Sequence, residues 1–200
     1  MSNVLIIIAA YLLGSIPTGL WVGKLFFNTD IREHGSKNLG ATNSFRILGR
    51  KAGIVVTVVD ILKGTAAVLL PYLAFFEDAT ISPLALGVIA LVGHMFPIFA
   101  GFRGGKAVAT SAGVLLGVAW PLFVILVFVF FGSLKLFKMV SLTSMISATA
   151  ALIYGIVYWI ITGNWGLCVM TIFLFVFIIY RHRDNIKRIK NGTEPKVKWI

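Results

Sequence analysis

The sequence predicts an all-α integral membrane protein, and three properties of the chain support this fold class. Of its 200 residues, 58% are hydrophobic and only 12% are charged, whereas soluble domains carry about 25% charged residues. Several apolar runs are long enough to cross a hydrocarbon core of about 30 Å. Because these runs do not alternate apolar with polar residues, helices are favoured over the strands of a membrane barrel.

Six apolar runs predict membrane-spanning helices. Pro17 and nearby glycines are expected to bend the first run, which lacks the basic start of a signal peptide. The chain has no internal repeat and no low-complexity linker, so residues 1–200 are expected to form a single domain. The runs cover about residues 3–27, 53–75, 81–100, 107–133, 140–162 and 164–180.

The positions of Lys and Arg predict the side of the membrane on which each polar segment lies. Cations are abundant in segments 28–52, 101–106 and 181–198, whereas the connection at Glu77 and Asp78 has none. Loops rich in Lys and Arg remain in the cytoplasm. The N-terminus is therefore expected outside, and the three cationic segments and the C-terminus are expected in the cytoplasm.

Six complete spans would leave the cationic tail outside, so one apolar run must be broken. A break before Pro121 resolves this conflict, because neighbouring helices in a membrane can satisfy the carbonyl that a proline frees. We therefore expect about seven transmembrane helices, two of them short, at about 107–119 and 121–133. Lys135 and Lys138 would then also face the cytoplasm.

Charge and missing chemistry exclude several classes of protein. The positive loops account for the net charge of +11, so no nucleic-acid partner is expected, although anionic lipids or substrates can use that charge. The single cysteine, Cys168, excludes a disulfide framework. No histidine has an acid five positions later, as in soluble-donor acyltransferases, and no G-x-S-x-G motif is present. No residue cluster suits zinc or magnesium, so neither a metal nor a cofactor is expected.

The first candidate site is HGSKNLGATNSFR, residues 34–46. Its glycines permit close approach to the backbone, and a helix start beside an arginine is a typical anion site. Thr42 or Asn43 is expected to cap a short helix that contains Arg46 and Arg50. An ordinary solvated loop is the alternative. The candidate residues are Gly35, Ser36, Asn38, Gly40, Ala41, Thr42, Asn43 and Arg46.

The second candidate site is GFRGGK, residues 101–106, which precedes a helix beginning near Ala107 and is similar to a phosphate cradle. It is not a nucleotide-binding loop, because the pattern G-x-x-x-x-G-K-[ST] requires glycine at position 100 and a hydroxyl at position 107, where Ala100 and Ala107 stand. A flexible turn is the alternative. The candidate residues are Arg103, Gly104, Gly105 and Lys106.

The third candidate site is in the tail. His182, Asn185 and Arg188 recur at three-residue spacing and therefore lie close to one helical face. His182 and Asn185 can hydrogen-bond a phosphate or a hydroxyl, and Arg188 can pair with Glu194. A basic tail on the membrane surface is the alternative.

Three further residues are expected to support the site. Asp60 and Lys63 lie within the second apolar run and can pair at a spacing of three residues, and charges inside a membrane are usually paired or functional. His94 lies at the end of the third run, where packing or support is the favoured role. Because all three polar segments face the cytoplasm in this topology, they are expected to converge on one site that stabilises negative charge.

In order, HGSKNLGATNSFR, GHMFPIFAGFRGGKAVAT and HRDNIKRIKNGTE resemble the three signature segments of the bacterial acyl-phosphate:glycerol-3-phosphate acyltransferases. The intervening VVDILKG is also similar, and the resemblance extends from about Gly14 to Glu194. Arg103 stands where lysine is commoner in that family and keeps the charge. The resemblance implies a multi-pass enzyme of the bacterial cytoplasmic membrane with its active site at the cytoplasmic face.

The resemblance also implies the reaction. Such enzymes transfer a fatty acyl group from acyl phosphate to the 1-hydroxyl of sn-glycerol 3-phosphate, giving lysophosphatidic acid and inorganic phosphate in the first step of phospholipid synthesis. They use neither acyl-CoA nor acyl carrier protein as direct donor. By resemblance and by chemistry, residues 36–43 are assigned to acyl phosphate, and Arg46, Lys106, His182 and Asn185 to glycerol 3-phosphate.

Two questions stay open at the level of sequence. The proton of the attacking hydroxyl could pass to a substrate phosphate oxygen, which we favour, or to His182 as general base, while Ser36 could form an acyl-enzyme. A phosphate transporter or a lipid-binding scaffold would also carry cationic loops, although a transporter usually contains a repeat.

Overall fold

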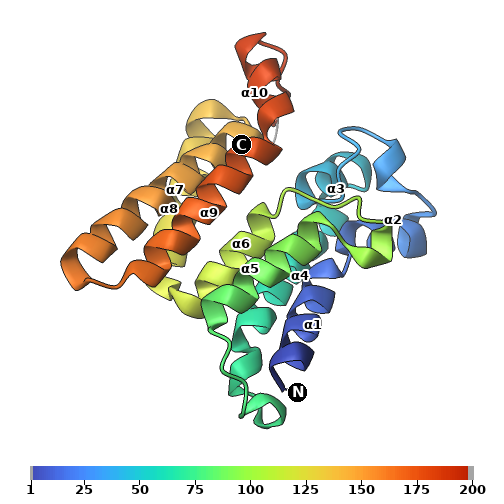
Figure 1. The fold of residues 1–200 in the computed structure, drawn as a ribbon. Helices are drawn as coiled ribbons and strands as arrows, with labels where there is room; N and C mark the ends of the chain where they lie inside the picture. Colours follow the sequence, from blue (N-terminus) through green and yellow to red (C-terminus); the bar gives the residue numbers. More distant parts are fainter. Residues whose placement is uncertain (1, 198–200) are drawn as a thin grey trace. The chain divides into compact units, whose positions relative to one another are not determined.

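The computed structural model describes residues 2–197 (Figure 1), and every regular element in that range is helical, which confirms the predicted all-α class. The α-helices are α1 (Ser2–Ser15), α2 (Thr18–Phe27), α3 (Ala41–Ile47), α4 (Arg50–Leu69), α5 (Pro83–Met95), α6 (Val108–Val118), α7 (Trp120–Phe137), α8 (Val140–Thr162), α9 (Trp165–Arg181) and α10 (Arg183–Lys190). The 3-10 turns are η1 (Ile31–Glu33), η2 (Leu70–Tyr72), η3 (Ala74–Phe76) and η4 (Ile98–Ala100).

The helices form two compact units, Met1–Val118 and Ala119–Ile200. The first contains α1 to α6 and the second contains α7 to α10. The units divide at the break that the sequence predicts, because α6 ends at Val118 and Pro121 lies in the first turn of α7. Proline suits that position because the first helical N–H groups have no intrahelical partner.

In the first unit, close contacts between backbones hold helix pairs together. A Cβ atom at Gly113 in α6 would lie 1.8 Å from the carbonyl oxygen of Ile61 in α4, and a Cβ at Gly14 in α1 would lie 2.0 Å from that of Ala90 in α5. Small residues at such contacts are typical of helix packing in membranes. Because α4 contacts α1, α5 and α6, its inner residues are surrounded by helices.

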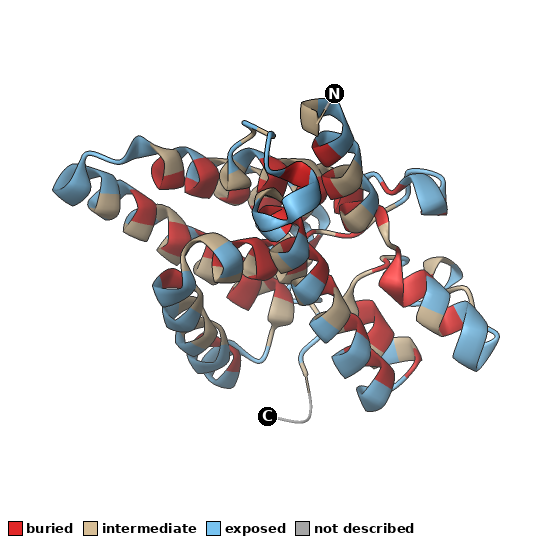
Figure 2. Ribbon diagram, turned by 90° about the horizontal axis from the view of Figure 1, so that it is seen from below, coloured by how far each residue is buried: buried red, intermediate tan, exposed pale blue. Residues whose placement is uncertain are grey.

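The second unit is a helical layer with an apolar exterior. α8 packs against both α7 and α9, and α10 bends away from α9 by 58°. Figure 2 shows long exposed stretches along the outer sides of the helices. Large apolar side chains lie there, such as Phe128 (74% exposed), Leu136 (77%) and Ile160 (74%). A hydrocarbon solvent makes such exposure favourable, so these faces fit contact with lipid.

The apolar helices agree only in part with the predicted spans. Four helices are long and apolar enough to cross a membrane, and up to six spans result if the bent pairs α1–α2 (47°) and α9–α10 (58°) each count as one. The predicted bend at Pro17 is confirmed. α6 is short, as predicted, but α7 is not: it continues through Ser133 and Lys135 to Phe137, beyond the predicted end at 133, and ends where Lys138 adopts a left-handed conformation.

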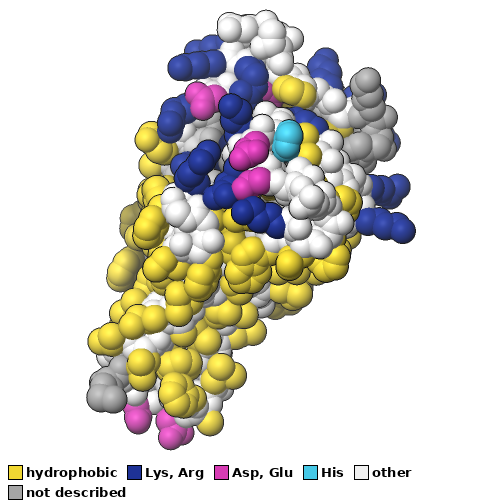
Figure 3. Space-filling view, turned by 90° about the vertical axis from the view of Figure 1, so that its right-hand side faces the viewer, with side chains coloured by type: hydrophobic (Ala, Val, Ile, Leu, Met, Phe, Trp, Pro, Cys, Tyr) yellow, Lys and Arg dark blue, Asp and Glu magenta, His cyan; other side chains and the backbone are white. Residues whose placement is uncertain are grey.

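Charge is separated along the molecular surface. Figure 3 shows Lys and Arg side chains gathered at one end of the face that it draws, with a few Asp, Glu and His side chains among them, and further acidic side chains at the opposite end beyond a broad apolar flank. Such a distribution is typical of a protein whose cationic loops remain on one side of a membrane. The number of spans and their orientation stay predictions.

Candidate functional site

The loop between α2 and α3 is built around the side chain of Asn43. This residue lies in α3 and is 1% exposed. Its Oδ1 accepts a hydrogen bond from the backbone N–H of Ser36 (3.0 Å), and its Nδ2 donates to the carbonyl oxygens of Ile31 (2.9 Å) and His34 (3.1 Å). One buried amide therefore satisfies three backbone groups and fixes the path of residues 31–36.

The start of α3 corrects the predicted cap. Gly40, rather than Thr42 or Asn43, is the N-cap residue, and it has no side chain to bond the first turn. The amide of Asn43 is turned toward the preceding loop and bonds carbonyl groups there, so it does not cap its own helix. Arg46 lies in α3, whereas Arg50 begins α4, so the predicted single short helix is two helices.

The rest of the first loop presents polar groups to its surroundings. Gly35 has a φ of +58°, and a Cβ there would lie 2.5 Å from Oδ1 of Asn43, so glycine fits this position on both counts. Oδ1 of Asn38 accepts a hydrogen bond from the N–H of Gly40 (2.9 Å) and closes the turn before α3. The exposed candidate residues are Gly35, Ser36, Thr42 and Arg46, while Asn38, Gly40 and Ala41 are half-buried.

The GFRGGK loop lies on the C-terminal end of α5. The N–H of Gly105 donates to the carbonyl oxygen of His94 (3.1 Å). A Cβ at Gly104 would lie 2.2 Å from that oxygen, and a Cβ at Gly105 would lie 2.1 Å from Nε2 of the His94 ring. Phe102 and Ala107 adopt φ values of +60°, which cost energy in residues with side chains and concentrate at functional loops. The helix after the loop begins at Val108, close to the prediction.

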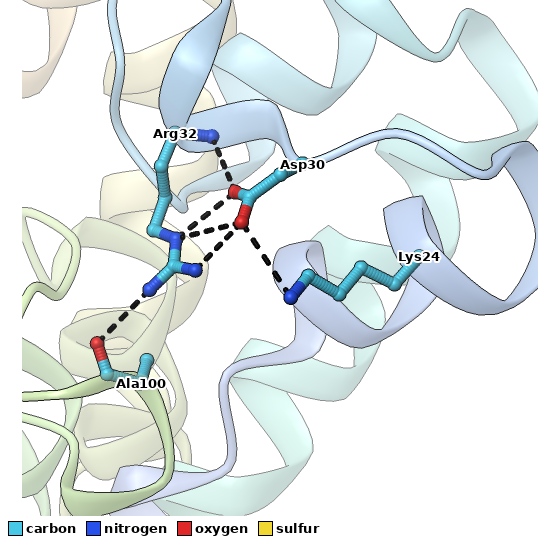
Figure 4. Close-up of polar contacts among 4 residues, drawn as sticks. All are labelled: Lys24, Asp30, Arg32 and Ala100. Carbon is cyan, nitrogen blue, oxygen red and sulfur yellow. Dashed lines mark hydrogen bonds and ion pairs between the residues drawn. The ribbon is translucent and has the colours of Figure 1, made fainter.

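An ion pair that the sequence analysis did not identify ties the two loops together (Figure 4). Arg32 bonds Asp30 through Nε (2.9 Å) and Nη2 (2.6 Å), and its Nη1 donates to the carbonyl oxygen of Ala100 (3.1 Å) in η4. Lys24 adds a weaker contact to Asp30 at 3.7 Å. A count of Lys and Arg residues does not distinguish Arg32 from the other cations of its loop. The neighbouring acid at Asp30 was the available signal for a local pair, but nothing pointed to Ala100.

Acid should weaken this tie. The hydrogen bonds from Arg32 are the main reason that the pKa of Asp30 falls from 3.8 to about 2. A lowered pKa means that the contribution is complete above pH 4 and is lost as the pH falls toward 2, amounting to about 2 kcal/mol of unfolding free energy. We expect the free energy of unfolding in detergent, measured from pH 5 to pH 2, to fall with the pH in the wild type. Asp30→Asn should lose this part of the pH dependence. The exposed neighbour Glu33→Gln is the matched control, and an unchanged slope in Asp30→Asn would contradict the assignment.

A charged pair is buried near both loops. Asp60 and Lys63 of α4 are 2% and 4% exposed, and Lys63 Nζ lies 2.8 Å from Asp60 Oδ1, which confirms the predicted pairing. The hydroxyl of Thr18 donates to Asp60 (3.0 Å), and Nζ of Lys63 donates to the carbonyl oxygen of Ile16 (2.8 Å). Because Pro17 interrupts the helix at this point, the pair bonds a residue on each side of the bend, the carbonyl of Ile16 and the hydroxyl of Thr18.

The buried pair, the helix break and both loops meet at one small cavity. Its volume is about 10 Å³, close to that of one water molecule and too small for a phosphate group. Leu39 of the first loop and Gly105 of the second both contribute to its wall, so two of the three candidate segments lie close together. The lining residues are Ile16, Pro17, Thr18, Leu39, Asp60, Lys63, His94, Pro97 and Gly105. The cavity is therefore not itself a substrate pocket.

In the second unit, the side chain of Glu194 is hydrogen-bonded to polar residues of α8 and α10. Its carboxylate accepts hydrogen bonds from Ser141 of α8 (2.5 Å), Asn185 (2.7 Å) and Arg188 (2.7 Å), which confirms the predicted Arg188–Glu194 pair. Burial alone would raise the pKa of Glu194, but these three hydrogen bonds outweigh it and hold the pKa below its ordinary value. The carboxylate thereby fixes the side of α10 that carries Asn185.

His182 lies at the junction of α9 and α10 and is 3% exposed. Its Nδ1 is 2.7 Å from the carbonyl oxygen of Ile178. Because a carbonyl only accepts hydrogen bonds, Nδ1 carries a proton and donates it to Ile178. The convergence of this tail segment with the two loops of the first unit stays a prediction.

Known proteins are similar in sequence to this protein along almost its whole chain. A family model described as glycerol-3-phosphate acyltransferase matches residues 4–192. The glycerol-3-phosphate acyltransferase of Bacillus subtilis (strain 168) is 58% identical over 196 residues, which cover 98% of each chain. That of Listeria monocytogenes serovar 1/2a is 56% identical over 200 residues, again 98% of each chain.

Two solved structures have the same fold. A crystal structure of PlsY (YgiH), an integral membrane glycerol 3-phosphate acyltransferase, in its glycerol 3-phosphate form gives a TM-score of 0.88 at 36% identity, covering 99% of this chain and 96% of that one. The lysophosphatidic acid form of PlsY gives a TM-score of 0.85 at 35% identity, with the same coverage.

Proposed function

The chain belongs to the family of glycerol-3-phosphate acyltransferases, and from this premise we propose how its loops carry out the reaction. It is an integral membrane enzyme that acylates glycerol 3-phosphate to lysophosphatidic acid. We propose that the donor is an acyl phosphate, that inorganic phosphate is the second product, and that acyl-CoA, acyl carrier protein and cofactors take no direct part. The observation that carries this proposal is the meeting of two glycine-rich cationic loops at one buried network, since such loops suit phosphorylated ligands.

The proposed location is the bacterial inner membrane, with the active site at its cytoplasmic face. The gathering of Lys and Arg side chains at one end of the face drawn in Figure 3 supports this orientation. The apolar outer faces of the helices suit direct contact with the lipid bilayer. Because the family match spans residues 4–192, across both compact units, we propose that the whole chain acts as a single domain.

The first loop is the proposed acyl-phosphate site. Ser36 and Thr42 are exposed there and can bond phosphate or carbonyl oxygens, while Asn43 holds the loop in shape. Gly35, Asn38, Gly40 and Ala41 would contribute turn geometry and backbone N–H groups. These short groups suit a substrate whose acyl chain must stay in the hydrocarbon region while its phosphate stays at the surface.

Glycerol 3-phosphate is the proposed ligand of the cationic side chains. Arg46 and Lys106 flank the two loops of the first unit, and Arg103, Gly104 and Gly105 would shape the cradle. From the second unit we assign His182 and Asn185 to the same substrate, with Arg188 and Glu194 supporting Asn185. Arg46 can bind a phosphate bidentately, whereas Lys106 acts as a point charge.

The chemistry needs little activation. The 1-hydroxyl oxygen attacks the acyl carbonyl carbon, the bond from that carbon to the phosphate oxygen breaks, and phosphate leaves with the bonding pair. We favour transfer of the hydroxyl proton to a substrate phosphate oxygen, since the second pKa of a phosphate is about 6. The rival base is His182, a histidine being the commonest general base.

Release of phosphate tests the proposal directly. Purified protein supplied with acyl phosphate and glycerol 3-phosphate should release inorganic phosphate without added CoA or metal, whereas a transporter or a lipid-binding scaffold should release none. Arg46→Ala and Lys106→Ala should each raise the KM for glycerol 3-phosphate about tenfold or more, as expected for a lost charged hydrogen bond. Lys51→Ala, in the exposed first turn of α4, is the control.

Two variants separate the mechanisms. Under direct attack, Ser36→Ala should slow turnover, and mass spectrometry of the wild-type enzyme after reaction with acyl phosphate alone should find no acylated protein. An acyl group on Ser36 would refute direct attack. If His182 is the base, His182→Ala should lose about three or more orders of magnitude in kcat.

A further inference from the structure

We propose that His94 is a positioning residue for glycerol 3-phosphate, because its ring sets the backbone of the GFRGGK loop at the residue before Lys106. This inference rests on the proposed role of that loop. His94 is 7% exposed and lies near the end of α5, before the loop. Lys106 is the last residue of the loop. The imidazole therefore acts on the substrate through the loop backbone and not by contact.

The first step is the fit between His94 and Gly105. The N–H of Gly105 donates to the carbonyl oxygen of His94 (3.1 Å), which brings the two ends of the loop together. The ring then occupies the space that a side chain at position 105 would need, since a Cβ there would lie 2.1 Å from Nε2, 3.0 Å from Cε1 and 3.1 Å from Cδ2. Ring and glycine are sterically matched.

The second step is what holds the ring. Nδ1 of His94 lies 3.0 Å from the hydroxyl of Thr110, which is fully buried in the first turn of α6. The same nitrogen lies 3.9 Å from Oδ1 of Asp60, which is in turn fixed by Lys63 and Thr18. The ring is therefore anchored to α6 and faces α4, so the loop backbone rests on a rigid support.

The third step is the consequence for Lys106. A displaced ring or a side chain at position 105 moves the backbone one residue before the ammonium group and leaves the rest of the enzyme in place. Loss of positioning should therefore appear in the KM for glycerol 3-phosphate, whereas a general structural defect would lower the yield of folded protein and kcat.

A double-mutant cycle tests this fit. Gly105→Ala should raise the KM for glycerol 3-phosphate about tenfold with a smaller change in kcat. His94→Asn keeps a polar atom facing Thr110 but lacks the Nε2 and Cε1 atoms that the new Cβ would strike. The variant with both changes should regain about fivefold in kcat/KM over Gly105→Ala alone, within the usual coupling of contacting residues.

Two further measurements keep the outcome decisive. Gly132→Ala, in α7 where a Cβ would meet nothing within 4 Å, is the glycine-to-alanine control and should leave KM and kcat unchanged. Thr110→Val, which removes the anchor at nearly constant volume, should raise KM in the same direction as Gly105→Ala.

Thermal unfolding without substrate provides the same cycle independently of catalysis. Gly105→Ala should lower the unfolding midpoint, and the double variant with His94→Asn should have a higher midpoint than Gly105→Ala alone. Strictly additive effects of the two changes on both KM and the midpoint would overturn the proposal. If the cycle shows coupling in the midpoint but none in KM, the contact exists and the positioning role is wrong. A wild-type enzyme that releases no phosphate would instead refute the proposed function.

Discussion

Replacing Lys63 by methionine should destabilise the protein more than almost any other single side-chain change. Asp60 would remain 2% exposed without the ammonium that lies 2.8 Å away, and breaking one side of a buried pair costs about 3–5 kcal/mol. Against a total stability of about 5–15 kcal/mol, this should lower the unfolding midpoint in detergent by about 10 °C. Asp60→Asn should have a comparable effect, because it leaves the buried cation.

The double variant Asp60→Asn with Lys63→Met should be more stable than either single variant, since no buried charge is then left unpaired. We expect it to recover more than half of the lost midpoint. Activity should recover less than stability, because the carbonyl of Ile16 still lacks its donor from Lys63. If the double variant were no more stable than the single ones, pairing would not be the role of these charges.

The exposed ion pair of the same unit provides the matched control. Lys24 is 55% exposed in its side chain and lies 3.7 Å from Asp30. Surface pairs contribute about 0–1 kcal/mol, so Lys24→Met should leave the midpoint almost unchanged. The contrast separates the effect of burial from that of charge removal.

Asn43 should be the most sensitive residue of the first loop for activity. Asn43→Ala removes the group that satisfies Ser36, Ile31 and His34, so residues 31–36 lose their fixed path. A displacement of about 1 Å in a positioned group can cost about 100-fold in rate. We therefore expect kcat/KM to fall about 100-fold in Asn43→Ala, measured by phosphate release.

Asn43→Asp should be worse than Asn43→Ala although it changes the shape of the side chain less. A carboxylate oxygen would replace Nδ2 and face the carbonyl oxygens of Ile31 and His34, which need donors, and the charge would be 1% exposed. We expect at least about tenfold further loss. Equal activity of the two variants would show that Asn43 fills space and does not organise the loop by hydrogen bonds.

Local pattern was sufficient to predict much of the fold. Apolar runs identified the helices, and proline marked both the bend at Pro17 and the break before Pro121. A spacing of three residues was enough to predict the pair between Asp60 and Lys63, because residues at that distance adjoin on any helix. The end of α7 was placed too early, because the helix continues past the end of the apolar run through the polar residues Ser133 and Lys135.

The inner organisation of the site was not predictable from local pattern. Asn43 looks like a cap because it stands near a helix start, and only the fold shows that its amide faces backward to groups up to twelve residues earlier. The bond from Arg32 to the carbonyl of Ala100 joins residues 68 apart, and backbone carbonyls carry no sequence signature. Such contacts depend on which helices pack together, and composition does not determine that.

The closing turn of the chain has a practical consequence for anyone shortening or tagging this enzyme. Glu194 is six residues from the end, yet it holds Ser141, Asn185 and Arg188, and the N–H of Val197 bonds the carbonyl oxygen of Lys138 (2.7 Å). Removing the last ten residues would remove the carboxylate of Glu194, to which Asn185 and Arg188 of α10 are hydrogen-bonded. A label at the other terminus would instead adjoin Asn3, whose side chain donates a hydrogen bond to the hydroxyl of Thr80 (3.1 Å) and accepts one from its N–H (2.8 Å).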